Sequence, residues 1–298
     1  MELRTLGKTG VKVSTVGMGC WQIGGPVPGV RKGWTGVTDK ESIATVRHCL
    51  DVGINLLDTA EGYGNGHSEK IIGQAIKNQR EKYIVATKVE PNEISYRYWN
   101  AETTDQEARK RIVEGCEDSL KRLQTDYIDI YQLHRIPQKS TINTVMESLN
   151  KLKTDGKIRW VGVSTNDLAK VKELMRCGEI SILQVAYNLL NRGGEDVLNF
   201  AAANNLGTLI KSPLASGALS GKYFNKTPNL DKEDRRISTF TSQEAIKKFR
   251  MLSELQFLTK DERRTITDSV LRFILDTPGV TCVIPGAKNR KQLEQNAH

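Results

Sequence analysis

The chain has 298 residues, with 44 Lys and Arg, 35 Asp and Glu, four His and a formal net charge of +9. This length suits one α/β barrel, which takes about 250 residues, so we expect residues 1–298 to form a single domain. The five cysteines are scattered, which argues against a disulfide framework and against a structural zinc site. Basic residues alternate with acidic ones along the expected helices, which favours a solvated surface over a nucleic-acid-binding face.

The start of the chain, Met1-Glu2-Leu3-Arg4, has no apolar core of a secretory signal, and no run approaches the roughly 20 apolar residues that span a bilayer. With free thiols, these features predict a cytoplasmic protein with no membrane partner. Two short extended pieces then flank Gly7-Lys8-Thr9-Gly10, a pattern typical of a β-hairpin. We expect this hairpin to close the bottom of a barrel.

Beyond the hairpin, short apolar runs alternate with amphipathic stretches. The expected strands are 16–20, 55–60, 83–89, 128–134, 158–164, 182–187, 207–212 and 280–285. The expected helices are 39–51, 68–79, 105–123, 142–155, 167–176, 194–204, 265–276 and one from 290. Strict alternation predicts parallel βα units, and their number favours an α/β fold of the closed (β/α)8 TIM-barrel type over an open sheet.

Long connections follow three of these strands, at 22–38, 90–104 and roughly 218–241. In a parallel barrel such loops lie on the catalytic face. Aromatic side chains on or beside two of them would form an apolar substrate pocket, and the alternative for each is local packing of a long loop. The candidates are Trp21, Trp34, Tyr98 and Trp99.

Ionisable side chains stand at the ends of three consecutive expected strands, namely Asp58, Lys88 and His134, and Tyr63 follows the first of these strands. Taken singly, each has an ordinary structural interpretation, such as a cap, a solvated strand end or a loop aromatic. Because the carboxyl ends of parallel strands meet at one face, we expect the four side chains to lie together.

The four groups have a coherent acid–base chemistry. A tyrosine has a pKa of about 10 in water, and a nearby ammonium lowers that value. A buried ammonium needs a carboxylate to stay charged, so Asp58 would hold Lys88 and Lys88 would act on Tyr63. Tyr63 then protonates an alkoxide as a hydride arrives, and a neutral His134 orients the carbonyl.

A resemblance to the aldo-keto reductases is carried by these same residues. Residues 53–69 read GINLLDTAEGYGNGHSE and resemble that family's signature, and further blocks follow in the family's order at 86–88, 129–134, 158–164, 184–190, 212–217 and 283–287. The resemblance covers essentially the whole chain. It implies a metal-free, NADPH-dependent oxidoreductase that reduces aldehydes or ketones, with NADH as a second possible cofactor, and its catalytic tetrad falls on Asp58, Tyr63, Lys88 and His134.

The same resemblance implies a cofactor shell. Ser164 and Gln184 would hold the nicotinamide amide, whereas the family's Asn is replaced by Thr165, with Asn166 beside it, and a stacking aromatic is replaced by Lys211. The family's usual Arg for a 2′-phosphate aligns with Gln292, beside Lys288 and Arg290. The full set is Gly19, Trp21, Asp58, Ser164, Gln184, Lys211, Ser212, Pro213, Leu214, Ser216, Gly217, Lys222, Gly286, Ala287, Lys288, Gln292 and Asn296.

Two other functions are compatible with parts of the sequence. A cofactor-binding redox sensor or regulatory module would bind the dinucleotide with little turnover, and the intact tetrad argues against it. A metal-dependent hydrolase is disfavoured because the four histidines, His48, His67, His134 and His298, form no His-x-His pair at a strand end. We expect a small carbonyl compound as the partner, no nucleic acid, and a monomer or weak homo-oligomer.

Overall fold

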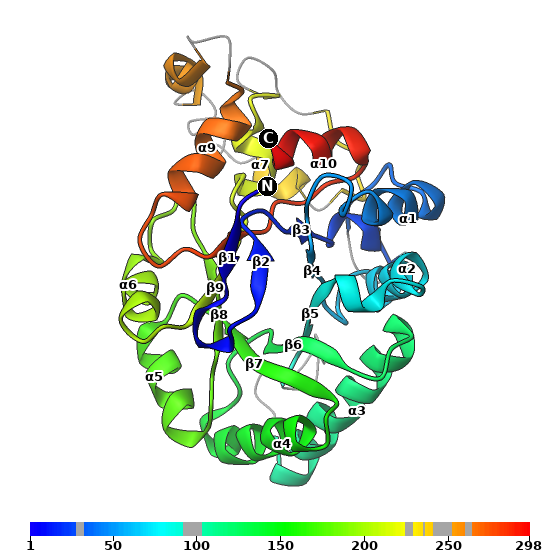
Figure 1. Cartoon of the computed structure of the whole chain (residues 1–298), viewed down its shortest axis with the longest axis vertical. Helices are drawn as coiled ribbons and strands as arrows, with labels where there is room; N and C mark the ends of the chain where they lie inside the picture. Colours follow the sequence, from blue (N-terminus) through cyan, green and yellow to red (C-terminus); the bar gives the residue numbers. More distant parts are fainter. Residues whose placement is uncertain (28–32, 92–102, 224–228, 235, 241–251, 260–263) are drawn as a thin grey trace.

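The computed structural model describes residues 1–27, 33–91, 103–223, 229–234, 236–240, 252–259 and 264–298. Parallel strands form a ring with helices outside it (Figure 1). The strands of the ring are β3 (Met18–Gly19), β4 (Leu56–Asp58), β5 (Ile84–Val89), β6 (Ile128–Leu133), β7 (Ile158–Ser164), β8 (Ile182–Ala186), β9 (Gly207–Lys211) and β10 (Cys282–Val283).

The ring is closed between its first and last strands. The sheet has eight strands in sequence order, and bridges from Val16 to Val283 and from Gly19 to Gly286 join the two edges. The strands are buried on both faces because helices cover the outside and apolar side chains fill the inside. The predicted (β/α)8 barrel is therefore confirmed.

Helices follow the strands in the expected alternation. They are α1 (Asp39–Arg47), α2 (His67–Ile76), α3 (Asp105–Leu123), α4 (Ile142–Thr154), α5 (Leu168–Cys177), α6 (Glu195–Ala203), α9 (Ile266–Leu275) and α10 (Arg290–Ala297), with a short α7 (Ile237–Phe240) in the long β9–α9 connection. Capping boxes begin α3 at Thr104 and α9 at Thr265, where each threonine hydroxyl and its partner carboxylate satisfy free backbone N–H groups.

Two predicted helices are shorter in the structure. The helix expected over 39–51 ends at Arg47, and the chain turns through Gly53 at φ +81°. The helix expected over 68–79 ends at Ile76, before a 3-10 turn over Arg80–Lys82. After Arg47 the apolar pattern continues through Cys49 and Leu50, and after Ile76 polar residues follow. Residues of both kinds are compatible with a helix or a turn, so the pattern did not fix either end.

The N-terminal hairpin pairs β1 (Leu3–Thr5) with β2 (Lys12–Ser14) and closes the lower end of the barrel. Leu6 and Val13 are buried among side chains from the beginnings of the strands, and the Lys8 N–H donates to the Asn205 carbonyl just before β9. In Figure 1 the hairpin lies across the centre of the ring. The opposite end, where the strands finish, is left for the functional site.

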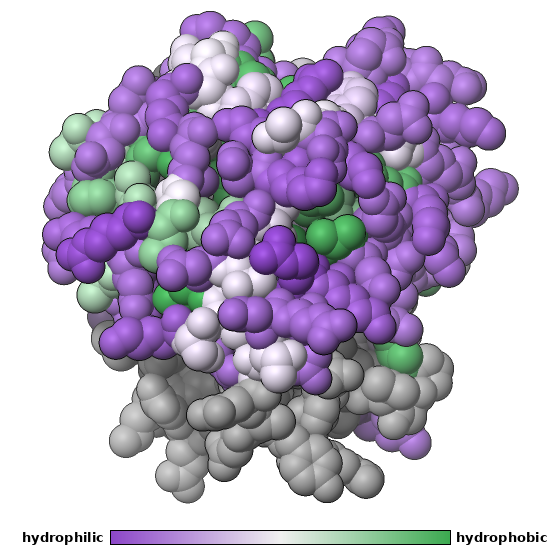
Figure 2. Space-filling model, turned by 90° about the horizontal axis from the view of Figure 1, so that it is seen from below, coloured by the Kyte–Doolittle hydropathy of each residue, from purple (hydrophilic) through white to green (hydrophobic). Residues whose placement is uncertain are grey.

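The described surface is mostly hydrophilic. Figure 2 shows one face on which polar residues predominate and apolar spots are scattered. Among the described residues, no helix has the length and apolar character needed to cross a bilayer.

Candidate active site

The four residues of the predicted tetrad lie together at the carboxyl ends of β4, β5 and β6. Lys88 is fully buried, and its ammonium donates to Asp58 Oδ2 (2.8 Å), to the Thr59 carbonyl (2.7 Å) and to Tyr63 Oη (3.2 Å). These three acceptors match the three N–H bonds of an ammonium. Lys88 is therefore held as a cation with its third proton directed at the phenol oxygen.

A close approach of two glycines fixes the loop that carries Tyr63. Gly64 has φ +61°, and a Cβ at this position would lie 2.0 Å from the Gly24 carbonyl oxygen. Only glycine tolerates both constraints, since an L side chain is strained at this φ and would collide with the backbone. The approach seats the Tyr63 loop against the 3-10 turn Gln22–Gly24 and holds the phenol over Lys88.

The charge environment of the pair differs in one respect from the expectation. Burial alone would lower the pKa of Lys88, but Asp58 and Tyr63 outweigh it and the pKa is raised. For Tyr63, burial raises the pKa more than Lys88 lowers it, so the net shift is upward. Lys88 does lower the pKa of Tyr63, as predicted. The predicted net lowering of that pKa does not occur, because burial outweighs Lys88. Tyr63 is thus a protonated phenol, the form that a proton donor requires.

His134 stands edge-on to Tyr63, with ring centroids 5.8 Å apart. Its Nδ1 lies 3.0 Å from Oε1 of the buried Glu90, although not in hydrogen-bonding alignment. Burial lowers the pKa of His134, and Glu90 opposes that shift. The ring is therefore neutral near pH 7, as expected. Glu90 is a partner that the sequence did not reveal, because its only signal was its place two residues after Lys88.

Replacing Glu90 by glutamine is expected to lower the pKa of His134 further, because a carboxylate stabilises the imidazolium and an amide does not. The four histidines can be followed individually by NMR titration of their ring protons. Glu294→Gln is the matched control, since Glu294 contacts His48 Nε2 at 2.9 Å and should lower the pKa of His48 alone. An unchanged titration of His134 in Glu90→Gln would refute the coupling.

Asp58 also faces the predicted nicotinamide pocket. Its Oδ1 accepts hydrogen bonds from Nε2 of Gln184 (2.7 Å) and of Gln132 (3.4 Å). Ser164 Oγ lies 3.4 Å from Gln184 Oε1, and the Lys211 ammonium donates to Ser164 Oγ at 2.7 Å. The predicted amide-binding pair is thus joined by hydrogen bonds to the tetrad on one side and to Lys211 on the other.

The two residues at the family's Asn position have structural partners. The Asn166 side chain donates to the Ala186 carbonyl and accepts from its N–H, both at 2.8 Å, so it ties the end of β7 to β8. Thr165 Oγ1 accepts from the Asp167 N–H at 3.0 Å. Ser164 and Gln184 therefore remain the candidates for binding the amide of a nicotinamide.

The segment after β9 forms a backbone cradle. Its residues Ser212, Ala215, Ser216 and Gly217 all have positive φ, between +46° and +96°. The N–H groups of Ala215 and Gly217 donate within the turn, to the Ser212 and Leu214 carbonyls. A run of unusual backbone such as Ala215–Gly217 can form a concave surface that binds anions. Pro213 and Leu214 lie within the same turn. This turn is the candidate site for the pyrophosphate of a dinucleotide.

Basic side chains gather around Lys288, which lies in the segment before α10. Burial lowers the pKa of Lys288, and Arg236 and Lys222 lower it further, while Asp234 opposes them. Arg236 is buried and donates to Asp234 at 2.9 and 2.7 Å. The excess of cations over carboxylates fits a phosphate group. Arg236 was missed because only the folded β9–α9 connection brings it to Lys288.

The remaining predicted cofactor residues shape the segment before α10. Gln292 Oε1 accepts from the Lys288 N–H at 2.9 Å, and Asn296 donates to the Gly286 carbonyl at 3.3 Å. Ala287 is buried between them. Gly19 donates its N–H to the Pro285 carbonyl and so ties β3 to this segment. In this structure Gln292 and Asn296 thus hold the loop that carries Lys288.

Two of the predicted substrate residues lie beside the tetrad. Trp21 stacks on Tyr63 with ring centroids 5.5 Å apart, and Trp34 packs edge-on against Trp21 at 6.5 Å. Trp34 is buried, with the Arg236 guanidinium 4.3 Å from its ring centroid, so it links Trp21 to the basic cluster. The other two, Tyr98 and Trp99, lie outside the described residues.

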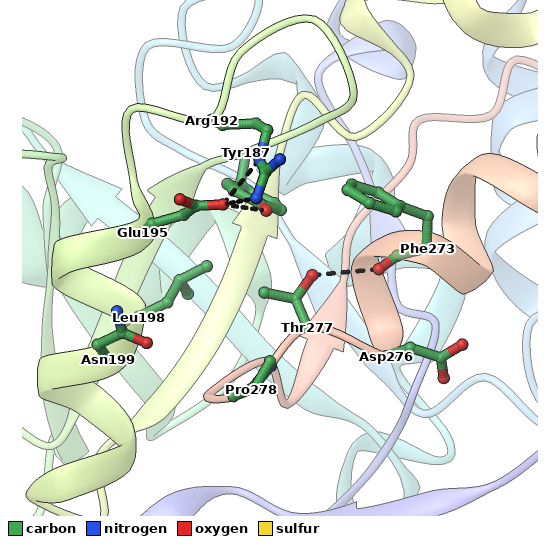
Figure 3. A pocket seen from close by; sticks show the side chains of 9 residues that line it. All are labelled: Tyr187, Arg192, Glu195, Leu198, Asn199, Phe273, Asp276, Thr277 and Pro278. Carbon is green, nitrogen blue, oxygen red and sulfur yellow. Dashed lines mark hydrogen bonds and ion pairs between the residues drawn. The ribbon is translucent and has the colours of Figure 1, made fainter.

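A separate hollow of about 390 Å³ lies in the outer helical layer, between α6 and α9 (Figure 3). Its polar side is an Arg192–Glu195 pair, and Tyr187 donates to Glu195 at 3.0 Å. It contains none of the predicted site residues. The described residues also hold no group of three or more His, Cys, Asp or Glu side chains suited to a metal ion.

A closed barrel with Asp58, Tyr63, Lys88 and His134 at its mouth defines a barrel oxidoreductase, and the comparisons with known proteins identify the family. The family model described as Aldo/keto reductase family matches residues 15–298, so the chain belongs to the aldo/keto reductase family and is an oxidoreductase.

Relatives match the chain along almost its whole length. It is 36% identical over 305 residues to the aldo-keto reductase YhdN of Bacillus subtilis, covering 99% of this chain and 87% of that protein. It is 31% identical to the NADH-specific methylglyoxal reductase of Escherichia coli, covering 99% and 92%. The structure of an aldo-keto reductase from Klebsiella pneumoniae in complex with NADPH superposes with a TM-score of 0.75 at 27% identity, covering 100% and 89%.

Proposed function

We propose that this protein reduces an aldehyde or ketone to the alcohol with NADPH and that Tyr63 is the proton donor. The observation that carries the proposal is the buried Lys88 ammonium, which is bonded to Asp58 and directed at Tyr63 Oη. When bound, the cofactor supplies a hydride to the carbonyl carbon. The carbonyl oxygen receives the phenol proton of Tyr63, so that a C–H and an O–H bond form as the C=O double bond becomes single.

Each of the other residues has a defined part. Lys88 donates to the Tyr63 oxygen and so stabilises the phenolate left after proton transfer, and Asp58 keeps Lys88 charged in a buried site. Neutral His134 stands beside the phenol and orients the carbonyl oxygen. Trp21 covers one face of the Tyr63 ring and excludes water from it. No protein residue needs to form a covalent bond with the substrate.

NADPH is proposed as the preferred cofactor on the basis of the cluster of Lys222, Arg236 and Lys288. The NADPH complex of the Klebsiella pneumoniae enzyme supports a phosphorylated cofactor. The NADH-specific Escherichia coli relative shows that the family also uses the unphosphorylated form. The two cofactors differ by one 2′-phosphate, so a basic side chain that contacts it discriminates between them.

Replacing Lys288 by methionine is expected to raise the Kd of NADPH about tenfold or more, because a charge-assisted hydrogen bond is worth about 1.5–3 kcal/mol. The Kd of NADH should change little. Titration by fluorescence measures both constants. Lys291→Met removes the same charge from an exposed position on α10 and should leave both constants unchanged. Equal weakening of NADPH and NADH would rule out a 2′-phosphate contact at Lys288.

The function itself is tested by following NADPH oxidation with an activated aromatic aldehyde and quantifying the alcohol. One alcohol formed for each NADPH consumed is the expected result. If the protein instead binds the cofactor tightly but turns over none of a broad panel of carbonyl compounds, it is better described as a cofactor-binding redox sensor or regulatory module.

We propose a cytoplasmic protein that acts on a small carbonyl compound as a monomer or weak homo-oligomer and binds no nucleic acid. The five cysteines are free, which suits a reducing compartment. Size-exclusion chromatography with light scattering would measure the oligomeric state.

A further inference from the structure

Lys211 ends β9 at the barrel mouth, and its ammonium makes one hydrogen bond, to Ser164 Oγ at 2.7 Å. Among the described residues it has no ion pair. This differs from Lys88, whose three N–H bonds all find acceptors, one of them a carboxylate. A partly buried ammonium without a carboxylate is costly to keep charged.

Charged groups on other strands of the barrel act on Lys211. Burial and the positive charge of Lys88 on β5 together lower the pKa of Lys211 to about 8, against the opposing effect of Asp58 on β4. The charge of Lys211 in turn contributes to the lowered pKa of His134, which follows β6. Asp58 forms an ion pair with Lys88, so the ammonium groups of Lys88 and Lys211 share the charge of this one carboxylate.

The hydrogen bonds link this charge to the proposed nicotinamide pocket. Lys211 donates to Ser164, and Ser164 lies 3.4 Å from Gln184 Oε1. These are the two side chains assigned to the nicotinamide amide. The nicotinamide ring is neutral in the reduced cofactor and carries a positive charge in the oxidised cofactor. A cation beside the pocket therefore repels one redox form and not the other.

We propose that Lys211 is a residue by which this site discriminates between the redox forms of its cofactor, weakening NADP⁺ relative to NADPH. The inference rests on the proposed function and adds a specificity for the redox state. It favours uptake of the reduced form and release of the oxidised product, which is the order that carbonyl reduction requires. An aromatic ring at this position would carry no such charge.

The sign of the pH dependence follows from the protonation of Lys211. Below about pH 8 the ammonium is charged, and discrimination against NADP⁺ is present; above this pH the amine is neutral, and discrimination is lost. By linkage, NADP⁺ binding promotes loss of the Lys211 proton, and NADPH binding does not. The 2′-phosphate titrates in both forms and cancels from the ratio of their dissociation constants.

The test is the ratio Kd(NADP⁺)/Kd(NADPH), measured by calorimetry from pH 6.5 to pH 9.5 in buffers of different ionisation enthalpy. For the wild type we expect this ratio to fall on the order of tenfold across the range, as expected for the loss of one nearby charge. Protons should be released on binding NADP⁺ near pH 8 and not on binding NADPH. Lys211→Met should give the low ratio at every pH, and Lys211→Arg should keep the high ratio at every pH.

Lys172→Met, at an exposed position on α5, is the matched control and should titrate like the wild type. If both cofactors bind but the wild-type ratio is independent of pH and equal to that of Lys211→Met, the inference is overturned and the proposed function stands. If neither cofactor binds the wild type, the proposed function fails and the inference fails with it. If Lys211→Met does not fold, the wild type and Lys211→Arg still test the inference. Only a titrating lysine makes the wild-type ratio of dissociation constants change with pH while that of Lys211→Arg stays high.

Discussion

Replacing Tyr63 by phenylalanine is expected to lower the turnover number for carbonyl reduction by roughly 10²–10⁴-fold, the usual contribution of a positioned proton donor. The change removes one oxygen atom and keeps the ring. The contacts of that ring with Trp21 and His134 therefore remain. Lys88 loses one acceptor but retains Asp58 and Thr59. The loss should fall on proton transfer and leave cofactor affinity nearly unchanged.

The measurement is a single-turnover reaction with the reduced cofactor and an activated aldehyde, run beside a fluorescence titration of the cofactor. Tyr187→Phe is the matched control, because it removes a buried phenol oxygen whose partner is Glu195 in the outer hollow of Figure 3. This variant should turn over at the wild-type rate. Wild-type turnover by Tyr63→Phe would contradict its assignment as the proton donor.

The barrel was predictable because each βα unit carries its own local pattern. Apolar runs marked strands such as β6 and β7, which are buried on both faces, and polar caps marked the beginnings of helices such as α3. Helix ends were less certain where the following residues permit either a helix or a turn: apolar Cys49 and Leu50 continue the pattern after Arg47, and polar residues follow Ile76. The strands β3 and β10 are only two residues long and are set by pairing with β4 and β9, and isolated bridges close the ring between them; no local pattern reveals these pairings.

The tetrad was predictable for a topological reason, since the ends of neighbouring parallel strands must meet. Its surroundings were not. Glu90 is placed against His134, and Arg236 near Lys288, by loops whose paths depend on tertiary packing. The net pKa shift of Tyr63 was also out of reach, because it is the balance of burial against the charge of Lys88. Sequence identifies the charges of a site, whereas the extent of their burial requires the fold.

Removing the charge of Asp58 by substitution with asparagine is expected to lower the free energy of unfolding by about 3–5 kcal/mol, because it leaves a fully buried ammonium without its carboxylate. Carbonyl reduction should be lost as well, since Lys88 then keeps its charge poorly. Lys88→Met leaves the Asp58 carboxylate without its cation, but the Gln184 and Gln132 amides still donate hydrogen bonds to it. We expect the lysine variant to be the less destabilised of the two.

The double variant Asp58→Asn with Lys88→Met should be more stable than the sum of the single changes predicts, because no buried charge is left unpaired. Urea unfolding of the four proteins gives the coupling energy, provided that the dependence on urea is the same in each. The exposed pair Lys151–Asp155 is the matched control, and the same cycle there should give less than about 1 kcal/mol. Equal coupling in the two cycles would show that the buried pair at the barrel mouth contributes no more than a surface pair, and would remove the physical basis for a permanently charged Lys88 beside Tyr63.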